Sequence, residues 1–182
     1  MTTPLSIIAA VVAVGLLYVV LPVAIDAYRR YRGTRLVTCP ETKQPAAVEV
    51  NAGRAALAAA LGERELHLQA CSRWPEREDC GQECLQQIEA TPEDCLVRAI
   101  LTKWFQGQTC VLCGQPFDSV ESWGHKTGFR TADGTTLAWG DLPAERLPEF
   151  LATCKPICWN CHMAESFRRR NPELVTDRPP HH

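Results

Sequence analysis

The chain has 182 residues, of which 46% are hydrophobic and 22% charged, and its formal net charge is −2. This composition excludes a collagen-like protein, a wholly disordered protein and a polytopic membrane protein. Because 19 basic residues stand against 21 acidic ones, the overall charge gives no basis for strong non-specific binding to nucleic acid. The unusual feature is the presence of ten cysteines, which metal, heme or disulfides must explain.

An apolar stretch lies near the start of the chain. Residues 7–25 carry no charge, and together with Leu5 and Ser6 they make a helix of roughly 30 Å, which is enough to cross a bilayer once. The preceding residues lack a basic region, and no small-residue cleavage motif follows the apolar run. These features favour an uncleaved anchor, residues 1–28, over a cleaved signal peptide.

Charged residues on the two sides of this span predict its orientation. Four arginines follow the span and none precedes it: Arg29, Arg30, Arg32 and Arg35. The positive-inside rule therefore predicts a single-pass protein of the inner membrane with its C-terminal body in the cytoplasm. Cytoplasmic thiols are kept reduced, so metal binding is expected rather than disulfides. A body on the other side of the membrane would make disulfides and covalent heme plausible again.

The first part of the body, residues 29–106, is expected to mix strands and helices. Two short strands are predicted within residues 36–50, on either side of a turn that begins at Cys39. An alanine-rich helix should follow Asn51 and end at Gly62, and a strand should lead to Cys71.

Two more helices are expected before the chain changes character at Gly107. One should begin near Gln82. The other should run from Thr91, a capping residue followed by proline and two acids, to Phe105. The remainder, residues 107–182, is predicted to contain a hairpin at 133–134, a short helix over 143–151 and a helix that begins at the second CxxC. The expected fold class is α+β.

Four cysteines of the C-terminal part form two CxxC pairs. Cys110 and Cys113 make one pair, and Cys158 and Cys161 make the other. Four thiolates in two such pairs predict a tetrahedral zinc site of the closed, structural type. Gly114 after the first pair suits the tight turn of a zinc knuckle, since glycine tolerates unusual backbone dihedrals.

A knuckle, a hairpin and a CxxC on a helix resemble a treble-clef zinc finger over residues 110–170. Within that family the chain resembles a degenerate HNH nuclease. His125 stands near the place of the general base, and His162 near that of the metal ligand. Gly124 replaces the usual acidic or histidine residue, and the asparagine expected before the second CxxC is missing. The resemblance therefore implies a structural zinc module, with an HNH-like nuclease as an alternative. The basic residues 168–170 are expected to be a solvated helix end.

The string CWNCH supports a different alternative. It matches a c-type heme attachment motif, in which Cys158 and Cys161 form thioethers and His162 is the proximal iron ligand. His67 or His125 would then be the distal ligand. The chain would in that case be an electron-transfer protein.

A second set of four cysteines lies in the first part of the body: Cys39, Cys71, Cys80 and Cys84. Their irregular spacing is compatible with zinc or with an iron–sulfur cluster. Zinc is favoured because no compact ferredoxin-like run is present, and buried or free thiols are the alternative. Cys95 and Cys154 are assigned no role.

The sequence thus predicts a membrane-anchored zinc-binding accessory or interaction protein with one or two structural zinc ions. Heme c or an iron–sulfur cluster, and with either of them electron transfer, is the alternative. The sequence gives no basis for a Ser-His-Asp arrangement or a phosphate-binding glycine loop, so an enzyme is less expected than a protein without catalytic activity. The expected partners are the membrane and a protein, as in a membrane complex, and neither nucleic acid nor a small-molecule substrate is indicated. As a whole, the chain resembles uncharacterised membrane-anchored, cysteine-rich bacterial families, which imply no activity.

Overall fold

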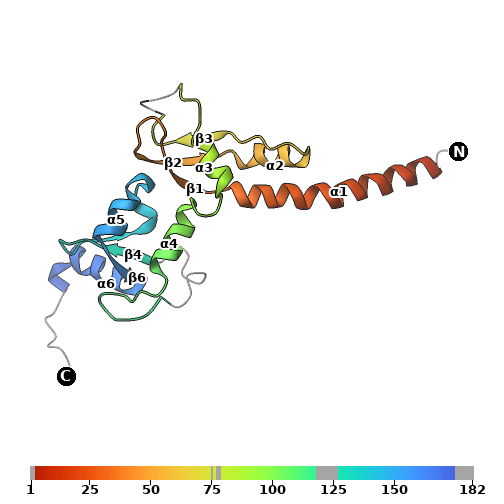
Figure 1. Cartoon of the computed structure of the whole chain (residues 1–182). Helices are drawn as coiled ribbons and strands as arrows, with labels where there is room; N and C mark the ends of the chain where they lie inside the picture. The colour runs from red at the N-terminus through yellow and green to blue at the C-terminus, as the bar shows by residue number, and fades with distance from the viewer. Residues whose placement is uncertain (1–2, 75, 77–78, 118–126, 175–182) are drawn as a thin grey trace. The chain divides into compact units, whose positions relative to one another are not determined.

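The computed structural model describes residues 3–74, 76, 79–117 and 127–174 (Figure 1). The chain divides into two compact units, residues 1–99 and residues 100–182. The boundary falls within one helix, α4, which spans Val97–Phe105. Each unit contains helices and a three-stranded sheet, so the mixed α+β class predicted from the sequence is confirmed.

The first element of unit 1 is the long helix α1, Thr3–Tyr31. Its segment Ser6–Tyr31 has a mean hydropathy of 2.8 in its most apolar 18-residue window, and no residue of that window is buried. The helix is therefore long and apolar enough to span a membrane. It contains Pro22 and ends with Arg29 and Arg30 in its last turn.

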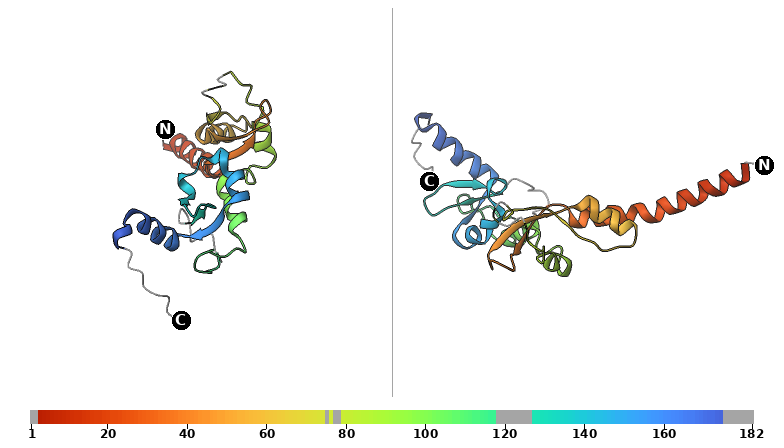
Figure 2. Two further views of the ribbon diagram at one scale, coloured as in Figure 1. Left: turned by 90° about the vertical axis from the view of Figure 1, so that its left-hand side faces the viewer. Right: turned by 90° about the horizontal axis from the view of Figure 1, so that it is seen from above.

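Helix α2, Ala52–Ala60, lies along the C-terminal end of α1, and the views from the side and from above agree on this (Figures 1 and 2). As expected, Asn51 caps α2, because its side-chain oxygen accepts a hydrogen bond from the Arg54 N–H at 2.9 Å. The buried face of α2 consists of alanines, and small side chains let two helices approach closely. The end of α1 is thus packed as part of the folded unit.

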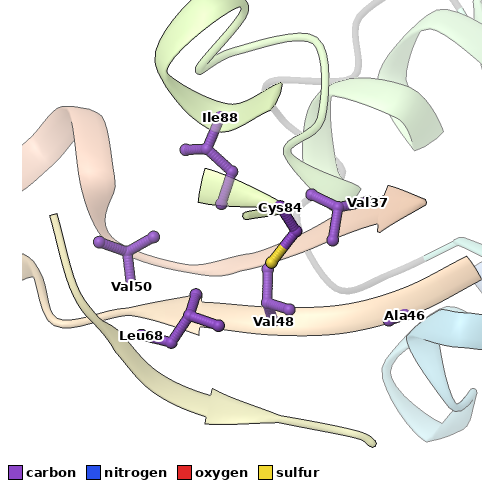
Figure 3. Packing of buried hydrophobic residues seen from close by; sticks show 7 residues of the cluster. All are labelled: Val37, Ala46, Val48, Val50, Leu68, Cys84 and Ile88. Carbon is purple, nitrogen blue, oxygen red and sulfur yellow. The ribbon is translucent and has the colours of Figure 1, made fainter. Parts of the chain in front are cut away.

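The sheet of unit 1 consists of three antiparallel strands in the order β1-β2-β3 (Figure 1). Their bounds are Thr34–Thr38, Pro45–Val50 and Leu68–Cys71. Alternate residues of β2 are buried, as the side-chain period of two requires. They join residues of β1, β3 and α3, Leu85–Ala90, in one hydrophobic cluster that Figure 3 shows: Val37, Ala46, Val48, Val50, Leu68, Cys84 and Ile88.

Arg35 has a structural role that the sequence analysis did not predict. It lies in β1 and is 0% exposed. Its guanidinium donates hydrogen bonds to the backbone carbonyls of Arg30 and, at 2.7 Å, Tyr31 at the C-terminal end of α1, and to that of Gly33 at 3.1 Å just after the helix. It also donates to the Pro92 carbonyl at 3.4 Å. Arg35 therefore satisfies carbonyls that a helix end leaves without intrahelical partners.

The helix predicted over residues 91–105 begins later than expected. Thr91 ends α3 instead of starting a helix, and α4 begins only at Val97. The intervening residues take part in tertiary contacts: the Leu36 N–H donates to the Cys95 carbonyl at 2.8 Å, and Leu96 forms a β-bridge with β1. These long-range backbone hydrogen bonds override a favourable helix start, because local propensity is a weak preference.

Unit 2 contains a second three-stranded antiparallel sheet in the order β5-β4-β6. Strands β4 and β5, Thr127–Arg130 and Thr136–Ala138, form the predicted hairpin, in which Gly134 takes φ +80°. Strand β6, Lys155–Cys158, leads directly into α6, Trp159–Arg170, which confirms the helix expected at the second CxxC.

The short helix predicted over residues 143–151 is a 3₁₀ turn, Ala144–Arg146, followed by α5, Leu147–Thr153. Two further 3₁₀ turns are Trp139–Asp141 and Pro172–Leu174. The core of unit 2 is largely aromatic, with Phe129 in contact with Trp104, Phe105 and Phe150. The indole N–H of Trp104 donates to the Leu151 carbonyl at 3.2 Å. This core packs against the sheet that contains β6, and the second CxxC lies where β6 passes into α6.

Candidate metal centre

The structure brings the two CxxC pairs of unit 2 together. The sulfur atoms of Cys110, Cys113, Cys158 and Cys161 all lie within 4.8 Å of one another. The sulfurs of Cys113 and Cys158 are 3.8 Å apart. Cys110 and Cys158 are buried, whereas Cys161 is half-buried and Cys113 is exposed. The cluster therefore has two buried and two more accessible thiols.

The first pair lies on a tight turn with defined hydrogen bonds. The Gly114 N–H donates to the Cys110 carbonyl at 2.8 Å, and the Cys110 N–H donates to the Gln115 carbonyl at 2.8 Å. Gly114 has φ +71°, a left-handed conformation that favours glycine. The predicted role of Gly114 in the turn is thus confirmed.

Two further hydrogen bonds connect this turn to β6. The Val111 N–H donates to the Pro156 carbonyl at 3.0 Å, and the Cys158 N–H donates to the sulfur of Cys110 at 3.3 Å. Cys158 is the last residue of β6, and Cys161 follows in the first turn of α6. The sequence carries no signal for the contact between Val111 and Pro156, because it depends on how residues distant in the chain meet.

The electrostatic environment favours ionisation of one cysteine. Burial opposes ionisation of Cys110, but the N–H groups of Cys158, Cys113 and Leu112 donate to its sulfur and outweigh that cost. They lower the pKa of the Cys110 thiol to about 6. Burial, together with the neighbouring thiols, raises the pKa of Cys161, and burial also raises the pKa of Cys158. Four thiols this close repel one another when ionised, and a bound cation removes that repulsion.

The geometry fits a metal ion with four thiolate ligands. Zinc binds thiolates at about 2.3 Å, so the sulfurs of a tetrahedral site lie about 3.8 Å apart. The distance of 3.8 Å between Cys113 and Cys158 agrees with that value. A site with four protein ligands has no open position for water or substrate, so a metal bound here would stabilise the fold.

His162 follows the second CxxC within α6. Its ring lies 5.5 Å from that of Trp159, and its Nδ1 is buried without a hydrogen-bond partner among the described residues. Burial lowers the pKa of this imidazole, so His162 favours the neutral form. His67, the other described histidine considered above, pairs with Glu65 at 2.7 Å. His125 lies outside the residues that the structure describes.

The basic end of α6 is engaged in local contacts. Arg168 pairs with Glu165 at 3.4 Å, and Arg169 donates to the Thr135 hydroxyl at 2.9 Å. Arg170 donates to the Ser166 carbonyl at 3.2 Å. These three side chains are therefore occupied by partners in unit 2.

The second set of cysteines lies around one pocket of unit 1. Cys39, Cys71, Cys80 and Cys84 all line this cavity of about 100 Å³. The sulfurs of these four cysteines are less tightly grouped than the four sulfurs of unit 2. Among the described histidines, cysteines and acidic residues, only the four cysteines of unit 2 lie close enough together to hold a metal ion. None of the ten cysteines, all of which lie in the described residues, is in a disulfide.

No known protein family, curated protein or solved structure matches this chain.

Proposed function

We propose that this chain is a membrane-anchored zinc protein in which a treble-clef-like module of unit 2 holds one structural zinc ion. Its role is that of an accessory or interaction protein of the inner membrane, with the body in the cytoplasm. The observation that carries the proposal is the cluster of Cys110, Cys113, Cys158 and Cys161, whose sulfurs lie within 4.8 Å of one another.

The arrangement of these four sulfurs favours one metal ion over covalent heme. Thioether bonds from Cys158 and Cys161 to a heme would remove two ligands from the cluster and leave Cys110 and Cys113 without a shared partner. A four-thiolate site instead uses both pairs, and zinc is the metal that commonly takes this donor set in structural sites. Because such a site has no open coordination position, its metal supports a surface or a fold and does not act on a substrate.

The anchoring part of the proposal rests on α1. The helix is apolar over the length that a bilayer requires, and arginines follow it on one side only. Its C-terminal end is held by the guanidinium of Arg35 and by packing against α2. An anchor that is continuous with the folded body keeps that body close to the membrane surface.

The first experiment is metal analysis with a visible spectrum, on the full chain purified in detergent without a metal-affinity tag. We expect zinc bound to the protein and a colourless solution. The variant Cys113→Ser should lose one zinc, because it removes one of four ligands, whereas Cys154→Ser should keep the wild-type content. A Soret band, or zinc content unchanged in Cys113→Ser, would contradict the proposed centre.

The orientation requires a separate experiment. A reporter that works only in the cytoplasm should be active when fused after residue 182, and a reporter that works only in the periplasm should be inactive there. The reason is that the arginines that follow the span are retained on the cytoplasmic side. Replacement of Arg29, Arg30 and Arg32 by glutamine should weaken this preference. A periplasmic reporter signal from the wild-type chain would refute the cytoplasmic location.

A further inference from the structure

Unit 1 contains a turn that has the same form as the metal-binding turn of unit 2. Residues 39–45 read CPETKQP, and residues 110–116 read CVLCGQP. In the first turn the Lys43 N–H donates to the Cys39 carbonyl at 2.8 Å, and the Cys39 N–H donates to the Gln44 carbonyl at 2.9 Å. The equivalent two bonds in the second turn are both 2.8 Å. The two turns thus share sequence positions and backbone hydrogen bonds.

The similarity extends to the backbone conformation and to the sulfur. Lys43 has φ +56°, although left-handed backbone is unfavourable for a residue other than glycine, and it occupies the place of Gly114. The hydroxyl and N–H of Thr42, with a smaller contribution from the Glu41 N–H, lower the pKa of the Cys39 thiol. This turn therefore holds its cysteine in the same backbone conformation as the CxxC turn of unit 2 does.

The turn of unit 1 supplies one ligand instead of two, because Thr42 stands where Cys113 stands in the other turn. Three more cysteines line the same pocket as Cys39: Cys71, Cys80 and Cys84. Cys71 ends β3 and lies opposite Val48 of β2, and its sulfur accepts a hydrogen bond from the Arg73 N–H at 3.5 Å. Four separate points of unit 1 thus bring one thiol each to a single cavity.

The cavity lies at the edge of a small hydrophobic core. Its apolar walls include Val37, Ala46 and Val48, which also belong to the buried cluster. Figure 3 shows Cys84 within that cluster, directed from the start of α3 toward β1 and β2. Burial and the three neighbouring cysteines raise the pKa of Cys84 to about 11. A cation bound between these sulfurs would offset both effects and would add stability that so small a core lacks.

We propose that Cys39, Cys71, Cys80 and Cys84 form a second four-thiolate zinc site, which stabilises unit 1 independently of the centre in unit 2. The site requires its sulfurs to come closer together than they lie in this structure, and rotation of the cysteine side chains about χ1 is the motion available to them. This inference goes beyond the proposed function, because it gives the membrane-proximal unit a metal of its own.

The first test counts zinc in full-length variants purified in detergent. The wild type should contain about two zinc ions per chain, Cys39→Ser about one, and Cys113→Ser about one. The double variant should contain none. Cys95→Ser is the matched control in the same unit, since Cys95 does not line the pocket, and it should keep two. One zinc in the wild type that only Cys113→Ser removes would overturn the second site and leave the first intact.

The second test uses the wild-type chain, so that a failure of a variant to fold cannot mislead. Thiols are alkylated in the presence of zinc or of a chelator, and each cysteine is then quantified by peptide mass spectrometry. Cys39, Cys71 and Cys80, which are partly accessible, should be protected by zinc and labelled after chelation. Cys95 and Cys154, which are not proposed ligands, should change in labelling much less than these three cysteines. Zinc-independent labelling of Cys39, Cys71 and Cys80 would overturn the proposal, as would iron and sulfide in place of zinc.

Discussion

Replacement of Arg35 by alanine tests whether helix α1 and the rest of unit 1 are one folded structure. The Arg35 side chain is completely buried, and its guanidinium donates to three carbonyls at or just after the end of α1 and to the Pro92 carbonyl. Burial lowers the pKa of Arg35, but that pKa starts so high that the group keeps its charge at neutral pH. The substitution removes all four hydrogen bonds and leaves a cavity.

The expected cost follows from the acceptors that lose their donor. A buried acceptor left without a partner costs about 1–3 kcal/mol. Water can reach some of these carbonyls once the side chain is gone, so we count two that remain dry. Together with the lost packing, Arg35→Ala should lower the free energy of unfolding by about 3–5 kcal/mol. Domains of this size are commonly stable by only about 5–15 kcal/mol, so the change would be large.

The assay is urea unfolding of the full chain in detergent. At each urea concentration a brief pulse of protease cleaves only unfolded chains, and the intact fraction of unit 1 is measured. The matched control is Arg64→Ala, because Arg64 is exposed in the same unit. This control should change the free energy of unfolding by less than about 0.5 kcal/mol. Arg35→Lys should fall between the two, since an ammonium keeps the charge but cannot reach several carbonyls at once.

A small effect would refute the reasoning. If Arg35→Ala unfolds within about 1 kcal/mol of Arg64→Ala, the guanidinium does not hold the end of α1 to the body. The same conclusion would follow if Arg35→Ala left protease cleavage after α1 unchanged. Either result would show that α1 is structurally independent of the rest of unit 1.

Two other predictions concern unit 2. Gly128→Ala should destabilise this unit by about 1–3 kcal/mol in thermal unfolding, because the added Cβ would lie 2.6 Å from the Leu137 carbonyl oxygen in the neighbouring strand. The control Gly140→Ala should be neutral, because its added Cβ would meet nothing within 4 Å. Equal effects of the two substitutions would contradict this explanation. Zinc affinity should fall with decreasing pH, because protons compete for the thiolates. The raised pKa values of Cys158 and Cys161 make binding release protons already at neutral pH, and the affinity should fall more steeply below about pH 6, where Cys110 also takes up a proton in the metal-free protein. Chelator competition across this range measures the effect, and affinity that stays constant down to about pH 4 would contradict it.

The local pattern of the sequence was enough to predict most elements. The apolar run before the arginines, the turn at Cys39, the cap at Asn51, the hairpin at Gly134 and the helix at the second CxxC all follow from short-range signals, and each is present. The spacing within each CxxC is also a local property. Two such pairs predicted one shared four-thiolate site, and the structure brings Cys110, Cys113, Cys158 and Cys161 together.

Contacts between distant residues decided the rest. The helix expected from Thr91 starts at Val97, because the Cys95 carbonyl accepts a hydrogen bond from the Leu36 N–H and Leu96 forms a β-bridge with Arg35 of β1. Arg35 looked like one of several charges next to a membrane span, yet the structure buries it against the end of α1.

The cysteines show the same division. Sequence by itself determined that the chain has an apolar span, short strands and helices, and cysteines spaced for metal, because these properties depend on residues that are near in the chain. The sequence grouped the four cysteines of unit 1 as a possible ligand set, but only the tertiary structure shows that they line one pocket and that Cys84 lies in the core. The physical reason is that burial and sulfur-to-sulfur distance depend on how the sheet and helices pack, and packing joins residues that local patterns cannot relate.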